Sequence, residues 1–367
     1  MFLSFILYFT IFSYTTIMMN YVDIFIISIK EKSKRLYEFF QFIIVYTPIM
    51  ALYGLRVNVG IDYPTYLSFY NVYKYSIHSI TDLFNQQFEP GYVLLNKLGY
   101  IFFHNDNGVF LISGIVIFFL LNYLIKQYHN IINKPTMIFI FIMVFFGASC
   151  NIVRQIIAML IIAIGYKYLI HDKYKEYILI CFIASLFHKT ALLCILLILF
   201  HKIYKMIHSK TRNLIIIISI AVLILGPFII QLLSKSSFYK ITYEKSGLTL
   251  SSLLFLLYLV PELVFMEKLK KNIKKNTFEH LNELICIYYL VIPFQLMDLY
   301  STAFQRIAIY FSILQIIIIP IIIHNQINSK RKLYLKIIVF LWYILFFIMT
   351  EIILVGNGLF PYHCLFW

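Results

Sequence analysis

The sequence consists of long apolar runs separated by short clusters of Lys and Arg, and this alternation restricts its fold more than any other feature. Runs of this length are typical of membrane-embedded helices. Of the 367 residues, 62% are hydrophobic and only 13% are charged, which leaves too little polar surface to cover a soluble globule. The sequence therefore predicts an all-α polytopic membrane protein with a single domain, residues 1–367.

We expect about 12 membrane segments, some of them short or re-entrant. Full-length spans are expected at residues 2–20, 37–55, 108–126, 213–232, 248–266, 281–297, 306–323 and 337–355. The region 136–203 holds further segments at 136–149, 152–170, 176–187 and 190–203. Short segments are tolerated where protein surrounds their ends. The first segment lacks a preceding basic residue and a cleavage site, so we expect a retained helix.

The basic clusters predict the orientation of these segments. They lie at residues 30–35, 126–134, 167–175, 202–212, 268–275 and 330–336 and hold most of the 31 Lys and Arg residues. All of them fall on one side, which the positive-inside rule makes cytoplasmic. Both termini then lie outside, together with Arg56, Arg154 and Arg306. The formal charge of +15 does not indicate nucleic acid, because a nucleic-acid binder gathers its basic residues on one solvated face.

The longest external stretch, residues 56–107, is too rich in Tyr, Asn and Pro to cross lipid. A helix that starts near residue 64 would have one face formed by Asp62, Tyr66, Tyr70 and Tyr73. A second helix is expected after Glu89, over residues 90–103, as an interfacial or re-entrant segment. We expect this external layer to roof a cavity.

Two polar runs interrupt the apolar region 136–203, and they are the strongest indication of a functional site. The first contains Asn151, Arg154 and Gln155, and the second is Phe187-His188-Lys189. An ionisable residue within a membrane segment costs about 2.5 to 3.5 kcal/mol on insertion scales, so it usually faces a partner or a watery cavity. We interpret this region as the wall of an active-site cavity.

These motifs occur in the same order as in the EpsG/Wzy-type polysaccharide polymerases, which the sequence resembles over nearly its whole length. The matching elements are the stretch from Arg56 to Tyr66, the Glu-Pro-Gly-Tyr at 89–92, the Asn-x-x-Arg-Gln at 151–155, the Phe-His-Lys-Thr-Ala-Leu at 187–192, the Arg306-x-x-x-Tyr310 pair and the Pro-Tyr at 361–362.

The resemblance implies a GT-C-like membrane glycosyltransferase that joins oligosaccharide repeat units at the outer face of the bacterial cytoplasmic (inner) membrane. The product would be O-antigen, capsule or exopolysaccharide, and both substrates would be linked to undecaprenyl diphosphate. Membrane lipids and a chain-length regulator protein are the other partners that the resemblance suggests.

The implied reaction assigns roles to particular residues. The departing diphosphate needs a metal ion or cationic donors, and the sequence contains no Asp-x-Asp, so we expect no metal and no cofactor. Arginine grips phosphate oxygens in pairs, and the candidates are Arg154, Arg306 and Arg56. The acceptor hydroxyl needs a proton acceptor, for which His188 and Asp62 are rivals. Supporting roles are expected for Asn151, Gln155, Tyr66, Glu89 and Tyr310.

Each candidate also has a structural explanation. Arginines at helix ends often reach lipid headgroups, and a single His in apolar surroundings is often hydrogen-bonded to a neighbouring helix. One helical face would carry Asp298, Ser301, Thr302 and Gln305, which would either line the cavity or cap a helix start. Three other functions stay open: an O-antigen ligase-type enzyme, a non-enzymatic glycan flippase or transporter, and a membrane acyltransferase.

Overall fold

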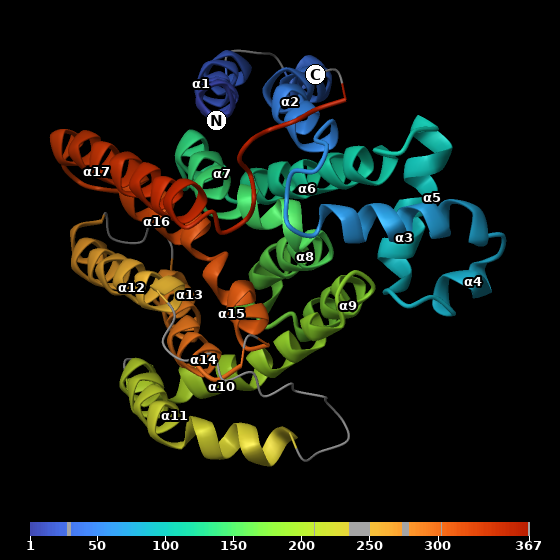
Figure 1. Cartoon of the computed structure of the whole chain (residues 1–367). Coiled ribbons are helices and arrows are strands. Elements are labelled where there is room, and N and C mark those ends of the chain that lie inside the picture. The colour runs from blue at the N-terminus through green and yellow to red at the C-terminus, as the bar shows by residue number, and fades with distance from the viewer. Residues whose placement is uncertain (28–30, 209, 235–249, 274–278, 302, 366–367) are drawn as a thin grey trace.

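The computed structural model describes residues 1–27, 31–208, 210–234, 250–273, 279–301 and 303–365 (Figure 1). Every regular element of these residues is helical. Nine stretches within them are long and apolar enough to cross a membrane. This confirms the all-α, multi-pass membrane class. The count of about 12 segments and the GT-C-like class stay predictions.

The helical elements follow one another along the chain. They are α1 (Phe2–Ile27), α2 (Glu31–Gly54), α3 (Tyr63–Ser76), α4 (Ile80–Phe84), α5 (Pro90–Phe103), α6 (Gly108–Gln127), α7 (Lys134–Asn151), α8 (Val153–Ile170), α9 (Tyr174–Ser185), the 3-10 helix η1 (Lys189–Leu196), α10 (Leu197–Ile207), α11 (Lys210–Ser234), α12 (Leu250–Leu269), the 3-10 turn η2 (Lys270–Asn272), α13 (Leu281–Tyr289), α14 (Val291–Asp298), α15 (Gln305–Ser312), α16 (Gln315–His324), α17 (Ser329–Phe347) and the π-helical turn η3 (Ile348–Ile353).

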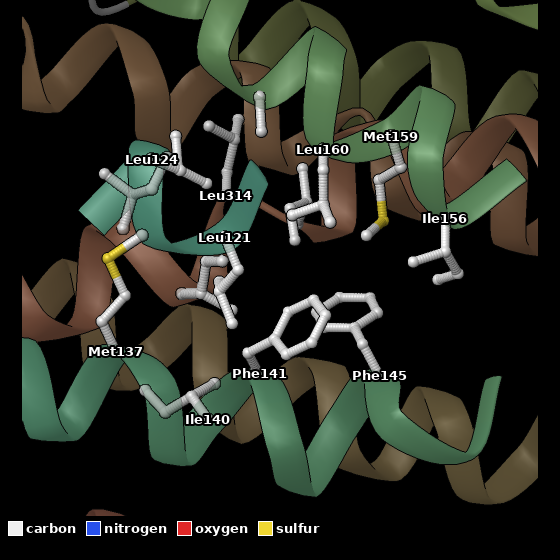
Figure 2. Close-up of a cluster of buried hydrophobic side chains, with 14 of the residues drawn as sticks. Leu121, Leu124, Met137, Ile140, Phe141, Phe145, Ile156, Met159, Leu160 and Leu314 are labelled. Atoms are coloured by element: carbon white, nitrogen blue, oxygen red, sulfur yellow. The ribbon is translucent and has the colours of Figure 1, made fainter. Parts of the chain in front are cut away.

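Helices α7 and α8 and the α15–α16 span form the centre of the bundle. Of an apolar 18-residue window in the span Gln305–His324, 83% is buried, compared with 22% of such a window in the span Ser329–Ile353, which includes α17. A helix that is apolar on all sides packs in the interior, and one with an open apolar side faces lipid. Figure 2 shows side chains of α6, α7 and α8 meeting Leu314 in this core.

Some predicted spans are broken, and the breaks have local causes. The predicted segment 281–297 divides at Leu290 into α13 and α14. Pro293 has no backbone N–H, so the carbonyl of Tyr289 loses its helical hydrogen bond there. The segment 306–323 divides between α15 and α16. Helix α17 ends in the π-helical turn η3, where the Thr350 hydroxyl donates to the carbonyl of Phe346 at 3.0 Å.

The external layer has the helices that its turn residues predict. Helix α3 buries Tyr66, Tyr70 and Tyr73, which are three of the residues expected on one face. Helix α5 begins at Pro90, directly after Glu89. In Figure 1, α3, α4 and α5 project to one side of the bundle.

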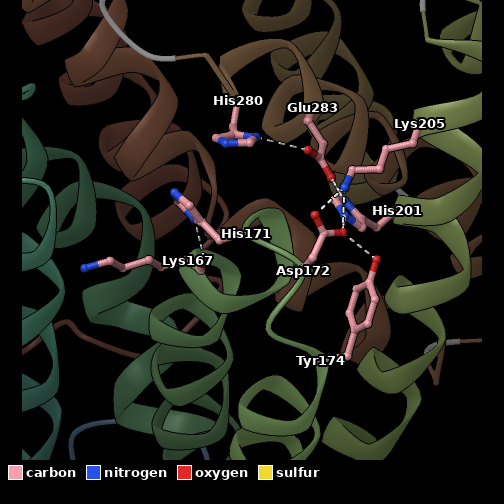
Figure 3. Close-up of polar contacts among 8 residues, drawn as sticks. All are labelled: Lys167, His171, Asp172, Tyr174, His201, Lys205, His280 and Glu283. Carbon is pink, nitrogen blue, oxygen red and sulfur yellow. Dashed lines mark hydrogen bonds and ion pairs between the residues drawn. The ribbon is translucent and has the colours of Figure 1, made fainter.

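The basic clusters meet at one end of the bundle. Ion pairs there join Lys126 to Glu38 at 2.8 Å and Arg212 to Glu267 at 3.2 Å. Figure 3 shows a further network at this end, in which the buried His201 bridges Asp172 and Glu283. Hydrogen bonds from Lys205, Tyr174 and His201 hold the pKa of Asp172 below its usual range. The clusters therefore lie on one side, and the assignment of this side to the cytoplasm stays a prediction.

The two termini meet at the opposite end. The Tyr8 hydroxyl donates to the carbonyl of Leu359 at 3.1 Å, and the backbone N–H of Tyr362 donates to Ser4 Oγ at 3.0 Å. Both contacts place the start of α1 beside the C-terminal segment. The same side of the bundle carries the loop 56–62, because the N–H of Gly60 donates to the carbonyl of Gly358.

Arg56 fastens this loop to the bundle. Its side chain is fully buried, and its guanidinium donates to the backbone carbonyls of Val59 at 3.2 Å, Cys150 at 3.3 Å and Tyr53. The guanidinium also stacks on the rings of Tyr53 and Phe110. Arg56 therefore ties the end of α2 to the end of α7.

Replacing Arg56 by Met should lower the melting temperature, because each buried carbonyl left without a donor costs about 1 to 3 kcal/mol. A thiol-reactive dye would follow unfolding in detergent, since Cys150, Cys181, Cys194 and Cys286 are buried. The control is Arg331→Met, at the exposed start of α17. Equal melting temperatures for the two variants would contradict this role.

Candidate active site

A cavity of about 1000 Å³, here called the chamber, lies among α7, α8, α12, α14, α15 and α17. Its polar lining consists of Gln155, Gln295, Asp298, Gln305, Arg306, Ser312, Gln315, Thr350, Glu351 and Asn357. Much of the remaining lining is aliphatic or aromatic, from Phe145, Leu257, Trp342, Leu345, Phe346 and Met349 among others. A chamber with both kinds of surface suits an amphipathic ligand. Leu354, Gly356 and Asn357 also border it, whereas no residue of 56–107 does.

Arg306 is the arginine that lines the chamber. It lies in the first turn of α15 and is exposed. Within the described part of the chain, its guanidinium makes no ion pair or hydrogen bond. The side chain of Gln155 donates to its backbone carbonyl, which fixes the start of α15 against α8. Arg306 is thus a positioned cation that is available to an anionic ligand.

Arg154 differs from Arg306, because it is already paired. Its guanidinium forms an ion pair with Glu89 and lies 4.0 Å from the centre of the Phe88 ring. The other oxygen of Glu89 accepts the backbone N–H of Lys189 at 3.2 Å. Burial would raise the pKa of Glu89, but Arg154 and the backbone amides outweigh it and hold this pKa below its usual value. The pair therefore stays charged at neutral pH.

His188 lies in the break between α9 and η1, beside this pair. Its Nδ1 is 2.6 Å from Thr190 Oγ1 and 3.5 Å from the Tyr310 hydroxyl, and the two hydroxyls are 3.1 Å apart. Burial lowers the pKa of His188 to about 4; Glu89 opposes the shift, and Arg154 and Arg306 add to it. The imidazole is therefore neutral at pH 7 and able to accept a proton.

Asn151 joins three segments on the same side of the bundle. Its Oδ1 accepts the backbone N–H of Asp62 at 3.1 Å, and its Nδ2 donates to the carbonyl of Asn357 at 2.9 Å. Gly60 approaches so closely that a Cβ there would lie 3.1 Å from Asn151 Oδ1, and its φ of +99° also favours glycine. Tyr66 packs edge-on against Tyr92.

The structure brings several of the predicted site residues close together beside the chamber. Ion-pair and hydrogen-bond contacts join Glu89 to Arg154 and to the His188 loop, and His188 to Tyr310. Arg306 lies near enough to lower the pKa of His188, and among these five residues it is the one that lines the chamber. Arg56 is turned into the protein and does not line the chamber, and Asp62 lies at the 56–62 loop with no hydrogen bond to His188.

Two residues that contribute to the site are not among those predicted from the sequence. One is Thr190, which is two residues from His188 and bonds to its Nδ1. The other is Glu351, which lies within an apolar segment, the same signal that identifies Arg154.

The predicted helical face of Asp298, Ser301, Thr302 and Gln305 is not part of one helix, because α14 ends at Asp298 and α15 begins at Gln305. Thr302 lies outside the described residues. In the described ranges, no group of three or more His, Cys, Asp or Glu side chains is arranged to hold a metal ion.

The fold and the chamber define a multi-pass membrane protein whose buried polar site is built from helix breaks. The chain belongs to the EpsG family, whose model matches residues 39–364. This confirms the resemblance seen in the sequence and indicates a membrane protein of the polysaccharide-polymerase type. A search of curated proteins gave no match, and neither did a search of solved structures.

The pKa of His188 predicts how stability depends on pH. Between its ordinary value of 6.5 and its folded value of about 4, the unfolded chain binds more protons, so stability falls as the pH is lowered through this window. His188→Gln should remove this part of the decline, measured as melting temperature between pH 7 and pH 4.5. The control is His129→Gln, at an exposed position. An unchanged decline in His188→Gln would contradict the neutral, buried imidazole.

Proposed function

We propose that this protein is a polymerase that joins undecaprenyl-diphosphate-linked oligosaccharide repeat units at the outer face of the bacterial cytoplasmic membrane. The observation that carries the proposal is Arg306, a cation that makes no ion pair with any described residue and lines a chamber with polar and apolar walls. A lipid-linked glycan has the matching parts: an apolar chain, an anionic diphosphate and a hydroxyl-rich sugar. Family membership supports the same class of reaction.

In the proposed reaction, the acceptor hydroxyl oxygen bonds to the anomeric carbon of the donor sugar. The bond from this carbon to the diphosphate oxygen breaks, and its electron pair leaves with the diphosphate. Arg306 stabilises the negative charge that develops on the leaving group. The hydroxyl proton passes to His188. No metal ion takes part.

His188 accepts a proton through Nε2 only in one tautomer. In that tautomer Nδ1 carries a hydrogen and donates it to Thr190 Oγ1, 2.6 Å away. The Thr190 hydroxyl then donates to the Tyr310 hydroxyl. Glu89 and Arg154 position the His188 loop. Asp62 stays the rival proton acceptor.

The three arginines therefore take different roles in the proposal. Arg306 binds the diphosphate directly. Arg154 supports the site through Glu89, and it remains near enough to influence the charge of His188. Arg56 holds the loop and is left out of the diphosphate site, because its N–H groups are used by backbone carbonyls.

Purified protein supplied only with lipid-linked repeat units, in the presence of a chelator, should produce a ladder of longer glycans on a gel. The substrate can be extracted from cells that lack the gene. Arg306→Gln should slow the reaction about 100-fold or more, the usual effect of removing a group that stabilises the developing anion. His188→Gln should fold and give no ladder, whereas Arg331→Gln should behave as the wild type.

The alternatives predict other results. A ligase-type enzyme would move single repeat units to a different acceptor without lengthening them. A flippase would leave the glycans unchanged. A full ladder from both Arg306→Gln and His188→Gln would contradict the proposed mechanism, and a full ladder from His188→Gln but not from Asp62→Asn would transfer the proton-accepting role to Asp62.

A further inference from the structure

Glu351 is an acidic residue within the apolar segment 337–355, and it lines the chamber. Its side chain is only 3% exposed. A carboxylate in a membrane segment is costly and is by default a candidate for function. Within the described residues, Glu351 makes no ion pair that would explain its presence as a structural contact.

Two features of the backbone surround this carboxylate, a π-helical turn and a glycine on a neighbouring helix. Glu351 lies in the π-helical turn η3, a wide turn that often occurs at functional sites. On the facing helix α7, a Cβ at Gly147 would lie 2.5 Å from Glu351 Oε1, so only glycine leaves room for the carboxylate. The turn follows α17 and the glycine lies on α7, so the carboxylate is placed between two helices that pack together.

One oxygen of the Glu351 carboxylate accepts a hydrogen bond, and the other has no donor within the described residues. Oε1 accepts from Asn357 Nδ2 at 2.5 Å, and Asn357 is held in turn by Asn151. Oε2 is buried and, within the described part of the chain, has no hydrogen-bond donor. Such an acceptor is unfavourable unless a ligand or water satisfies it.

The chamber therefore contains a carboxylate and a guanidinium that do not pair with each other. Two different polar groups in one cavity that have no protein partner within the described residues indicate a ligand with two different parts. A diphosphate would satisfy Arg306, and hydroxyl hydrogens would satisfy Glu351. Trp342 Nε1 and Gln155 Oε1 are also buried without partners in the described residues, and both residues line the chamber. They provide one further donor and one further acceptor for hydroxyl groups.

We propose that Glu351 binds hydroxyl groups of the sugar next to the diphosphate, so that the chamber recognises both ends of the sugar–diphosphate bond. This inference rests on the proposed function and adds its substrate class. The bound sugar is rich in hydroxyl groups, because these groups can satisfy the Glu351 oxygen that has no partner within the described residues. Glu351 positions the sugar and takes no proton.

Native mass spectrometry on ice would measure binding of two probes to the purified protein: bare undecaprenyl diphosphate, and lipid-linked repeat units extracted from cells lacking the gene. The wild type should prefer the sugar-bearing lipid. Glu351→Gln should reduce this preference about tenfold, the effect of losing one hydrogen bond, and leave binding of the bare lipid unchanged. Arg306→Gln should weaken the binding of both lipids.

Two further variants separate binding from folding. Gly147→Ala would displace the carboxylate without changing its chemistry and should reduce the preference as well. Glu262→Gln is the matched control, because Glu262 is also buried but has both oxygens bonded, to Tyr288 and Tyr343, and lies outside the chamber lining. It should keep the wild-type preference.

The sugar site would be overturned if Glu351→Gln and Gly147→Ala both kept the full preference for the sugar-bearing lipid. This holds even when the wild type makes a ladder. A wild type that binds both lipids equally would also overturn it. Absence of any ladder from the wild type, with the preference intact and lost in Glu351→Gln, would instead contradict the polymerase reaction and leave the sugar site supported.

Discussion

The ion pair between Arg154 and Glu89 is the contact on which the arrangement of the site depends. A lone buried charge in a membrane protein is costly, and a paired one is tolerated when further hydrogen bonds satisfy it. Glu89 meets this condition by also accepting the N–H of Lys189. One carboxylate thus holds the start of α5, the start of α8 and the break after α9. His188 lies in that break, so its position follows from the pair.

The same principle separates structural charges from available ones. Arg56 donates its N–H groups to backbone carbonyls, and Arg154 forms an ion pair with Glu89. Arg306 and Glu351 line one chamber and make no ion pair in the described part of the chain. A membrane protein that leaves both unmatched has two places where a ligand can replace water. We consider this contrast more informative than the presence of arginine alone.

The sequence predicted the elements better than the contacts. The helical class, the start of α5 at Pro90 and the buried face of α3 follow from local rules, because turn residues and helical spacing act over a few positions. The role of Arg56 depends on the carbonyl of Cys150, 94 residues away, which no local pattern contains. The energetic cost of an ionisable residue in an apolar segment points to Arg154, and it applies equally to Glu351 in the predicted span 337–355. The break at Leu290 was also predictable from Pro293.

The central claim is that the chamber binds a lipid diphosphate at Arg306. A cryo-EM structure of the protein with undecaprenyl diphosphate would test it most directly. We expect phosphate density within hydrogen-bonding distance of the Arg306 guanidinium, with the polyprenyl chain along the apolar wall of the chamber. Phosphate density elsewhere, for example at the basic end of the bundle, with an empty chamber would contradict it.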